Sequence, residues 1–164
     1  GDLYFFGKGI PKNLIEAHAL YSLAIKYRNG DEFSQEWIKP KLEEVEKELT
    51  ASQLSESNAR MLALEKDFLK YCEEALNQLF QNIEENDKNS KLDIEYSDGI
   101  IKIMIDESKK TFVINRHSAS QKIWCSSPFS GVAYFSFNQT NNQWLDTKNR
   151  ELISTIINEL NNYF

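Results

Sequence analysis

Apolar side chains recur along this chain with two different periods. In the first part of the sequence they return every three or four positions, which is typical of amphipathic helices. The clearest stripe predicts a helix over Asp67–Glu85, and its apolar members are Leu69, Cys72, Leu76, Leu79 and Ile83.

From residue 92 onward the apolar positions alternate with polar ones, as they do in half-buried strands. We expect strands over 92–96, 100–105, 111–114, 121–126, 133–137 and 143–145, and a closing helix over 147–162. Ser97-Asp98-Gly99 predicts a tight turn, and further turns are expected at Gly30–Phe33 and Asp106–Lys110. Helix, strand meander and helix together predict an α+β two-layer sandwich, an antiparallel sheet with one face covered by two helices.

The expected strand over 121–126 has an aromatic residue on its polar side. Alternation places Lys122, Trp124 and Ser126 on one face, and the apolar Ile123 and Cys125 on the other. An exposed aromatic among polar groups is typical of a recognition surface. The alternative is that Trp124 only packs against neighbouring strands.

The region before residue 65 reads as a set of helices. Asn13 is a candidate N-cap, and a charged helix is expected over Ser34–Leu49, with Pro40 in its early part. Thr50-Ala-Ser-Gln has the spacing of a capping box and would start a helix that runs to about residue 64. We expect a helical domain over 1–64 and a second domain over 65–164, with no Gly/Pro linker between them.

Composition excludes several classes of partner. A net charge of −6 and a pI near 5.0 argue against nucleic acid or an anionic membrane as the main partner. No apolar run approaches the roughly 20 residues that span a bilayer, and no signal peptide opens the sequence. Cys72 and Cys125 form no C-x-x-C pair, so we expect buried free thiols and a cytoplasmic location.

The negative charge is concentrated in one segment. Residues 65–98 contain ten acidic and four basic side chains. Glu84, Glu85 and Asp87 stand at the C-terminal end of the expected helix, where each negative charge opposes the helix dipole by about 0.3–1 kcal/mol. Such a run is often only a solvated surface. The alternative is a patch retained for hard cations or for a basic protein surface.

Motifs for other chemistry are missing from the sequence. His18 and His117 are expected at the surface, and there is no H-E-x-x-H motif, phosphate loop or Cys/His ligand spacing. Zinc, haem and iron–sulfur ligation are therefore not expected. An enzymatic alternative, in which carboxylates act as an acid/base pair, would require a concave pocket with perturbed acidities.

The run V-I-N-x7-I-W-x-S-S-P-x-S-G over 113–131, preceded by Tyr96-Ser97-Asp98-Gly99, resembles the frataxin family, the bacterial CyaY type in particular. The resemblance covers roughly residues 65–164. It implies weak binding of iron, Fe2+ or Fe3+, and docking on a cysteine desulfurase and an iron–sulfur scaffold protein. The implied role is that of a regulator or iron donor in cluster assembly. It implies no enzymatic activity beyond the weak ferroxidase activity claimed for some members.

The resemblance also implies which residues act. Carried over by position, the acidic ridge would consist of Glu84, Glu85, Asp87, Asp93 and Glu95, and Glu73 from the same acidic segment completes the metal-binding candidates. The sheet face that meets the desulfurase and scaffold would present Asn115, Lys122, Trp124 and Ser126.

The N-terminal run G-x-x-Y-x-x-G-x-G-I-P-x-N, followed by A-x-x-x-Y-x-x-A, resembles the Sel-one class of tetratricopeptide-like repeats. Such repeats are helix pairs that stack on one another to bury their apolar faces. The resemblance implies a further protein partner for this region. It also supplies an alternative function, that of a helical-repeat scaffold or adaptor.

Overall fold

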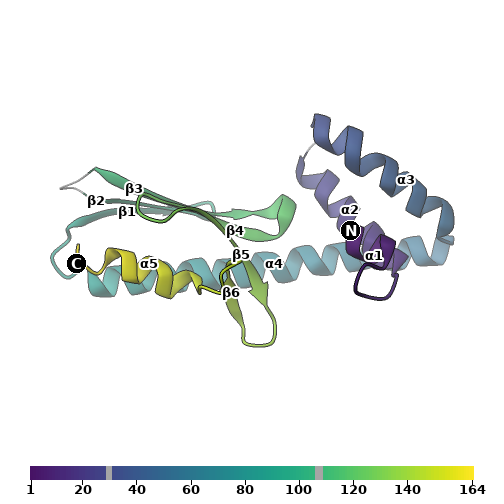
Figure 1. Ribbon diagram of the computed structural model, residues 1–164. Helices are drawn as coiled ribbons and strands as arrows, with labels where there is room; N and C mark the ends of the chain where they lie inside the picture. The colour runs from purple at the N-terminus through teal and green to yellow at the C-terminus, as the bar shows by residue number, and fades with distance from the viewer. Residues whose placement is uncertain (29–30, 106–108) are drawn as a thin grey trace. The chain divides into compact units, whose positions relative to one another are not determined.

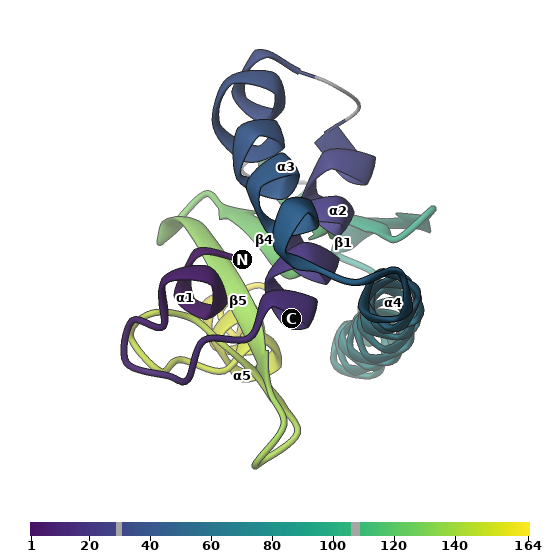
Figure 2. The same cartoon turned by 90° about the vertical axis from the view of Figure 1, so that its right-hand side faces the viewer.

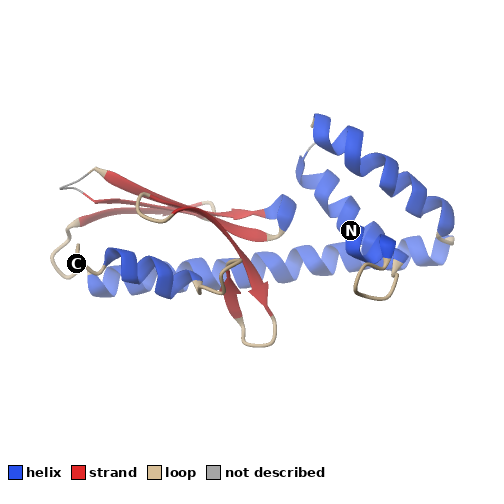
Figure 3. Ribbon diagram, viewed as in Figure 1, coloured by secondary structure: helices blue, strands red, loops and turns tan. Residues whose placement is uncertain are grey.

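The computed structural model describes residues 1–28, 31–105 and 109–164. The chain divides into two compact units, which Figure 3 shows as a group of helices and a sheet flanked by helices. The helical unit comprises Gly1–Phe68 and Ser118–Ser120, and the sheet unit comprises Leu69–His117 and Gln121–Phe164. The turns expected at Gly30–Phe33 and Asp106–Lys110 lie partly outside the described residues.

The helical unit is built from short helices. They are α1 (Asp2–Phe6), α2 (Leu14–Arg28), the π-helical turn η1 (Ser34–Ile38), α3 (Lys39–Glu48) and the first part of α4 (Ala51–Asn86). A short 3-10 turn, η2 (Ser118–Ser120), is grouped with them. Their core is small and contains the buried residues Phe5, Ala17, Tyr21 and Val45.

The helix starts follow local side-chain chemistry. Asn13 accepts a hydrogen bond from the backbone N–H of Glu16 at 3.0 Å, as an N-cap does. Thr50 and Gln53 form the reciprocal capping box at the start of α4, at 2.9 and 3.3 Å. These short-range bonds satisfy backbone donors that the first helical turn leaves unpaired.

The sheet unit contains one antiparallel sheet whose strands follow chain order. The strands are β1 (Leu92–Ser97), β2 (Ile100–Ile105), β3 (Lys110–His117), β4 (Lys122–Ser127), β5 (Gly131–Asn138) and β6 (Gln143–Leu145). Asp98 and Gly99 form the tight turn between β1 and β2, both with positive φ. The α+β two-layer architecture expected from the sequence is thereby confirmed.

Two helices cover one face of this sheet. Figures 1 and 2 show α5 (Leu152–Leu160) and the C-terminal part of α4 on the same side of the strands. The inward positions of the central strands are almost fully buried, among them Ile101, Ile103, Phe112 and Ile114. From the helices, Leu76, Leu79, Ile83, Leu152 and Ile156 fill the same layer. Among the described residues of this unit, no helix lies on the opposite face of the sheet, which is called the helix-free face below (Figure 1).

Two helix boundaries differ from the sequence prediction. The helices expected to meet near residues 63–66 form one continuous helix, α4, because no glycine, proline or cap interrupts the stretch. The closing helix begins at Leu152 instead of residue 147, because the Glu151 side chain caps it by accepting from the backbone N–H groups of Ile153 and Ser154.

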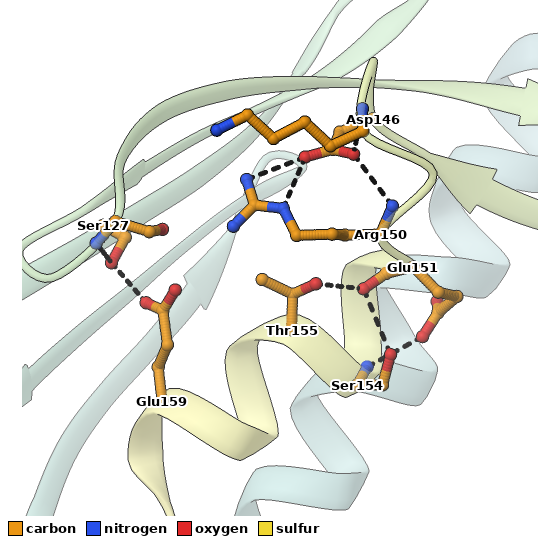
Figure 4. A network of polar contacts seen from close by, with 9 residues as sticks. Ser127, Asp146, Arg150, Glu151, Ser154, Thr155 and Glu159 are labelled. Carbon is orange, nitrogen blue, oxygen red and sulfur yellow. Dashed lines mark hydrogen bonds and ion pairs between the residues drawn. The ribbon is translucent and has the colours of Figure 1, made fainter.

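Residues 146–150 form a loop that is held in place by its first residue, Asp146. Its buried carboxylate accepts from the backbone N–H of Lys148 and from the backbone and guanidinium of Arg150 (Figure 4). Burial would raise the pKa of Asp146, but these donors outweigh it and hold the pKa below its usual value. In the same view, the Ser127 hydroxyl donates to Glu159, which joins the end of β4 to α5.

None of the helices within the described ranges is long and apolar enough to cross a membrane.

Candidate functional site

The C-terminal end of α4 carries two exposed carboxylates. Glu84 and Glu85 lie in the last turn, and that turn contains no basic residue. The last carbonyl groups of a helix give that end a partial negative charge. The two carboxylates are therefore repelled by the helix end and by each other. Within the described residues, neither forms an ion pair shorter than 4 Å.

Asp87, directly after α4, has a different environment. It is buried, and its two carboxylate oxygens accept from the backbone N–H groups of Lys91 and Leu92, each at 2.9 Å. It therefore braces the loop that leads from α4 into β1. Iron could reach this carboxylate only if both bonds were given up, so its assignment as a metal ligand stays a prediction that its geometry does not favour.

Strand β1 carries the other two carboxylates of the predicted ridge. Asp93 and Glu95 are exposed, on the sheet face that the helices leave free, opposite Met104 and Lys102 of β2. Lys102 approaches Glu95 at 3.9 Å, with both side chains more than half exposed. Such a pair is worth about 0–1 kcal/mol, so it neutralises little of the patch.

The carboxylates do not converge on one point. Over the described residues, no group of three or more His, Cys, Asp or Glu side chains could hold a metal ion. Glu73 is exposed on α4, about three turns before Glu84, and lies near Tyr96. The pKa of Tyr96 is raised, mainly by burial and then by the negative charge of Glu73. The arrangement suits loose, exchangeable contact with hard cations or a basic surface, since a tight site needs more ligands.

Trp124 lies on the helix-free face of the sheet, as its place in the alternation predicts. It is half-buried and stands between Asn115 of β3 and Tyr134 of β5 in the strand register. Lys122 and Ser126 are half-buried on the same face, whereas their neighbour Ile123 is fully buried on the other. The structure thus brings the four predicted sheet-face residues onto one surface.

Sequence reasoning missed the apolar residues that surround them. Ile100, Met104, Val132 and Tyr134 are 36%, 38%, 62% and 43% exposed. The strand register places all four on the helix-free face. Alternation within β2 and β5 could have shown this, because each strand places an apolar residue on its outward side.

Asn115 has an unsatisfied polar atom. Its Oδ1 is buried, and no residue within the described ranges donates a hydrogen bond to it. A buried acceptor without a donor costs about 1–3 kcal/mol.

The thiols and one histidine lie in the interior. Cys72 and Cys125 are buried, as expected, and burial raises the pKa of each thiol to about 12. They are therefore poor nucleophiles and poor ligands at neutral pH. The expectation that His18 is a surface residue is wrong: only 4% of it is exposed, because α2 turns it toward α3 and α4.

A cleft of about 820 Å³ lies between α4, the β5–β6 hairpin and α5. Its apolar floor includes Tyr71, Phe137 and Trp144, and the rings of Tyr71 and Phe137 stack 4.4 Å apart. None of the six predicted carboxylates is among its lining residues. Two other carboxylates, Glu74 and Glu151, do line the cleft, and that of Glu151 is occupied as the N-cap of α5.

The sheet unit resembles known proteins in sequence. Residues 62–164 match the family model described as the frataxin-like domain. The mitochondrial frataxin homolog of Schizosaccharomyces pombe is 30% identical over 92 residues, which cover 56% of this chain and 58% of that protein. The mitochondrial frataxin of Dictyostelium discoideum is 33% identical over 75 residues, which cover 43% of this chain and 38% of that protein. The matches thus span between 38% and 58% of the length of those relatives.

Among solved structures, the trimeric frataxin of Saccharomyces cerevisiae, complexed with ferrous iron, aligns with a TM-score of 0.49 and 26% identity. The alignment covers 57% of this chain and 84% of that chain.

Proposed function

The chain belongs to the frataxin-like domain family, and we propose that its sheet unit binds iron weakly and acts as a regulator or iron donor in iron–sulfur cluster assembly. It does so by docking on a cysteine desulfurase and a scaffold protein, without catalysis of its own. The observation that carries the proposal is the position of exposed, unneutralised carboxylates at the edge of a helix-free sheet face that presents a tryptophan.

Iron binding is supported by the ligand chemistry. Carboxylate oxygens are hard ligands, and the exposed Glu73, Glu84, Glu85 and Asp93 have no cationic side chain within 4 Å among the described residues. Because they do not form a closed site, iron would keep most of its water ligands and exchange rapidly. Weak, exchangeable binding fits a protein that delivers or senses iron.

Docking is supported by two surfaces of different chemistry. The carboxylates of α4 and β1 match a basic partner, through contacts that weaken as salt rises. The helix-free face offers Trp124 with apolar neighbours, which suits a desolvated contact. We assign the acidic surface to the desulfurase and the sheet face to the desulfurase–scaffold assembly.

Iron binding is tested by titrating Fe2+ into the 15N-labelled chain under anaerobic conditions. Backbone signals of Glu84 and Asp93 are expected to shift or broaden first. The double variant D93N/E95Q should lose the β1 response, whereas E43Q/E56Q, which removes two exposed carboxylates of the helical unit, should retain it. Perturbation confined to other regions would refute the site assignment.

Docking is tested by pull-down of a purified cysteine desulfurase. The charge reversal E84K/E85K is expected to abolish capture, and wild-type capture should weaken between 50 and 300 mM salt. W124A should reduce capture of the scaffold-bound assembly, with unchanged circular dichroism showing that the sheet is intact. Equal capture by wild type and E84K/E85K at low salt would contradict the docking proposal.

The repeat-like sequence of the helical unit predicts that this unit binds a second protein partner. A scaffold function for the whole chain predicts that residues 1–68 alone would capture that partner. It also predicts that charge reversal at Glu84 and Glu85 would leave capture unchanged.

A further inference from the structure

The buried His18 of α2 contacts two other helices of the helical unit. Its Nδ1 lies 2.8 Å from the hydroxyl oxygen of Ser57 in α4, and Ser57 is fully buried. The Ser57 hydroxyl donates its own proton to the backbone carbonyl of Ile15 at 2.9 Å. A hydroxyl has one proton to give, so toward His18 it can only accept. Nδ1 therefore carries a hydrogen and donates it.

The other ring nitrogen faces a carboxylate. Nε2 of His18 lies 3.4 Å from Oε1 of Glu46 in α3, and the Glu46 side chain is 47% exposed. If the imidazole is neutral, its hydrogen is on Nδ1 and the lone pair of Nε2 points at the carboxylate, so two acceptors oppose each other. If the ring takes up a second proton, the same contact becomes an ion pair.

The polar contacts between α2 and α4 do not depend on that proton. Arg60 binds Glu16 at 2.8 Å, and Lys26 binds Glu65 at 2.7 Å. Hydrogen bonds from Lys26 and from Tyr27 hold the pKa of Glu65 below its usual value. Neither pair involves a ring nitrogen of His18.

One carboxylate of α1 and one of α3 are paired with other side chains. Asp2 of α1 is taken by Tyr21 and Lys41, and Glu48 of α3 pairs with Lys12 at 3.4 Å. Among the described residues, Glu46 is thus the carboxylate that pairs with the imidazole.

We propose that His18 is a proton-operated latch in the helical unit. When the imidazole is doubly protonated, it joins α3, through Glu46, to the α2–α4 pair. When Nε2 loses its proton, the opposed acceptors drive Glu46 into solvent. Helix α3 then keeps its apolar contacts and the ion pairs Lys12–Glu48 and Lys41–Asp2, but no polar contact with the α2–α4 pair through His18. The Ser57 bond keeps the ring oriented in both states.

The first test reads the tautomer directly. In the full chain with His117→Gln, His18 is the sole histidine, and its two nitrogens can be followed by 15N NMR from pH 5 to 8.5. At high pH we expect the hydrogen on Nδ1 and an unprotonated Nε2. The opposite tautomer would overturn the proposal.

The second test measures release of α3. After correction for intrinsic rates, amide protection within α3 should be about two- to fivefold greater at pH 5.5 than at pH 8, as for a part-exposed ion pair of up to about 1 kcal/mol. E46Q should bring this ratio close to one, because a carboxamide can donate to neutral Nε2 and accept from the protonated ring. E43Q makes the same charge change on α3 and should keep the wild-type ratio. If E46Q also keeps it, the latch is refuted.

Discussion

Replacement of Asp87 by asparagine tests whether its carboxylate stabilises the fold or binds iron. In the wild type, Oδ1 accepts from the backbone N–H of Lys91 and Oδ2 accepts from that of Leu92. Asparagine keeps one acceptor oxygen but turns an NH2 group toward the other backbone donor. The Leu92 bond is buried, so water cannot readily replace the lost acceptor.

The expected cost follows from those two bonds. A hydrogen bond to a charged group contributes about 1.5–3 kcal/mol, and a buried donor left unsatisfied costs about 1–3 kcal/mol. The two figures overlap, because they describe the same N–H group, so we expect Asp87→Asn to destabilise the sheet unit by about 2–3 kcal/mol. With an m-value of about 1–3 kcal/mol/M, the urea midpoint should fall by roughly 0.7–3 M.

The assay is urea unfolding followed by tryptophan fluorescence in a Trp37→Phe background, which leaves Trp124 and Trp144 as reporters of the sheet unit. Asp93→Asn is the matched control: it removes the same charge from an exposed position and should change stability by less than about 0.5 kcal/mol. Equal midpoints for the two variants would refute the bracing role of Asp87.

The same variant also tests the ligand assignment. If folded Asp87→Asn protein still shows the Fe2+ response at Asp93, the carboxylate of Asp87 is not needed for iron. If that response disappears while the fold persists, Asp87 acts as a ligand.

The remaining predictions concern the loop before α5 and the β1–β2 turn. Because its partners lower the pKa of Asp146, its stabilising contribution should be present above the unfolded pKa of about 3.9 and be lost as pH falls through the lower folded value. Asp146→Asn should therefore flatten the acid limb of a stability–pH curve; an unchanged limb would contradict this. Gly99→Ala should cost about 1–2 kcal/mol in urea unfolding, since φ is +76° and the new Cβ would lie 3.0 Å from Nε of Arg116. A loss below 0.5 kcal/mol would show that the turn relaxes freely.

Local sequence patterns were sufficient to predict most of the helices, strands and turns of the sheet unit. The alternation in β4 alone separates Trp124 from Ile123 and Cys125, and it assigns them to the correct faces. The capping box at Thr50 and the turn at Gly99 are likewise readable, because the atoms that form them are neighbours in the sequence. Exposure of Glu84 and Asp93 also follows from their position on a helix and a strand with a buried opposite side.

The parts that sequence could not supply depend on which side chains become buried, whether their partners are distant in the chain, as for His18, or close to them, as for Asp87. His18 sits on a helix whose apolar pattern gives no sign that Ser57, 39 positions later, will accept from its ring. Asp87 looks the same as Glu84 and Glu85 in a run of charges, and only the path of the chain into β1 turns it inward toward two backbone donors.

The sequence by itself thus determined which residues alternate, which helices are capped and where negative charge accumulates, because these depend on neighbours within one or two turns. Tertiary structure alone decided which polar groups lose their water. Desolvation depends on what packs on top of a residue, and that is what made one carboxylate a brace, left the others at the surface and enclosed His18 between three helices.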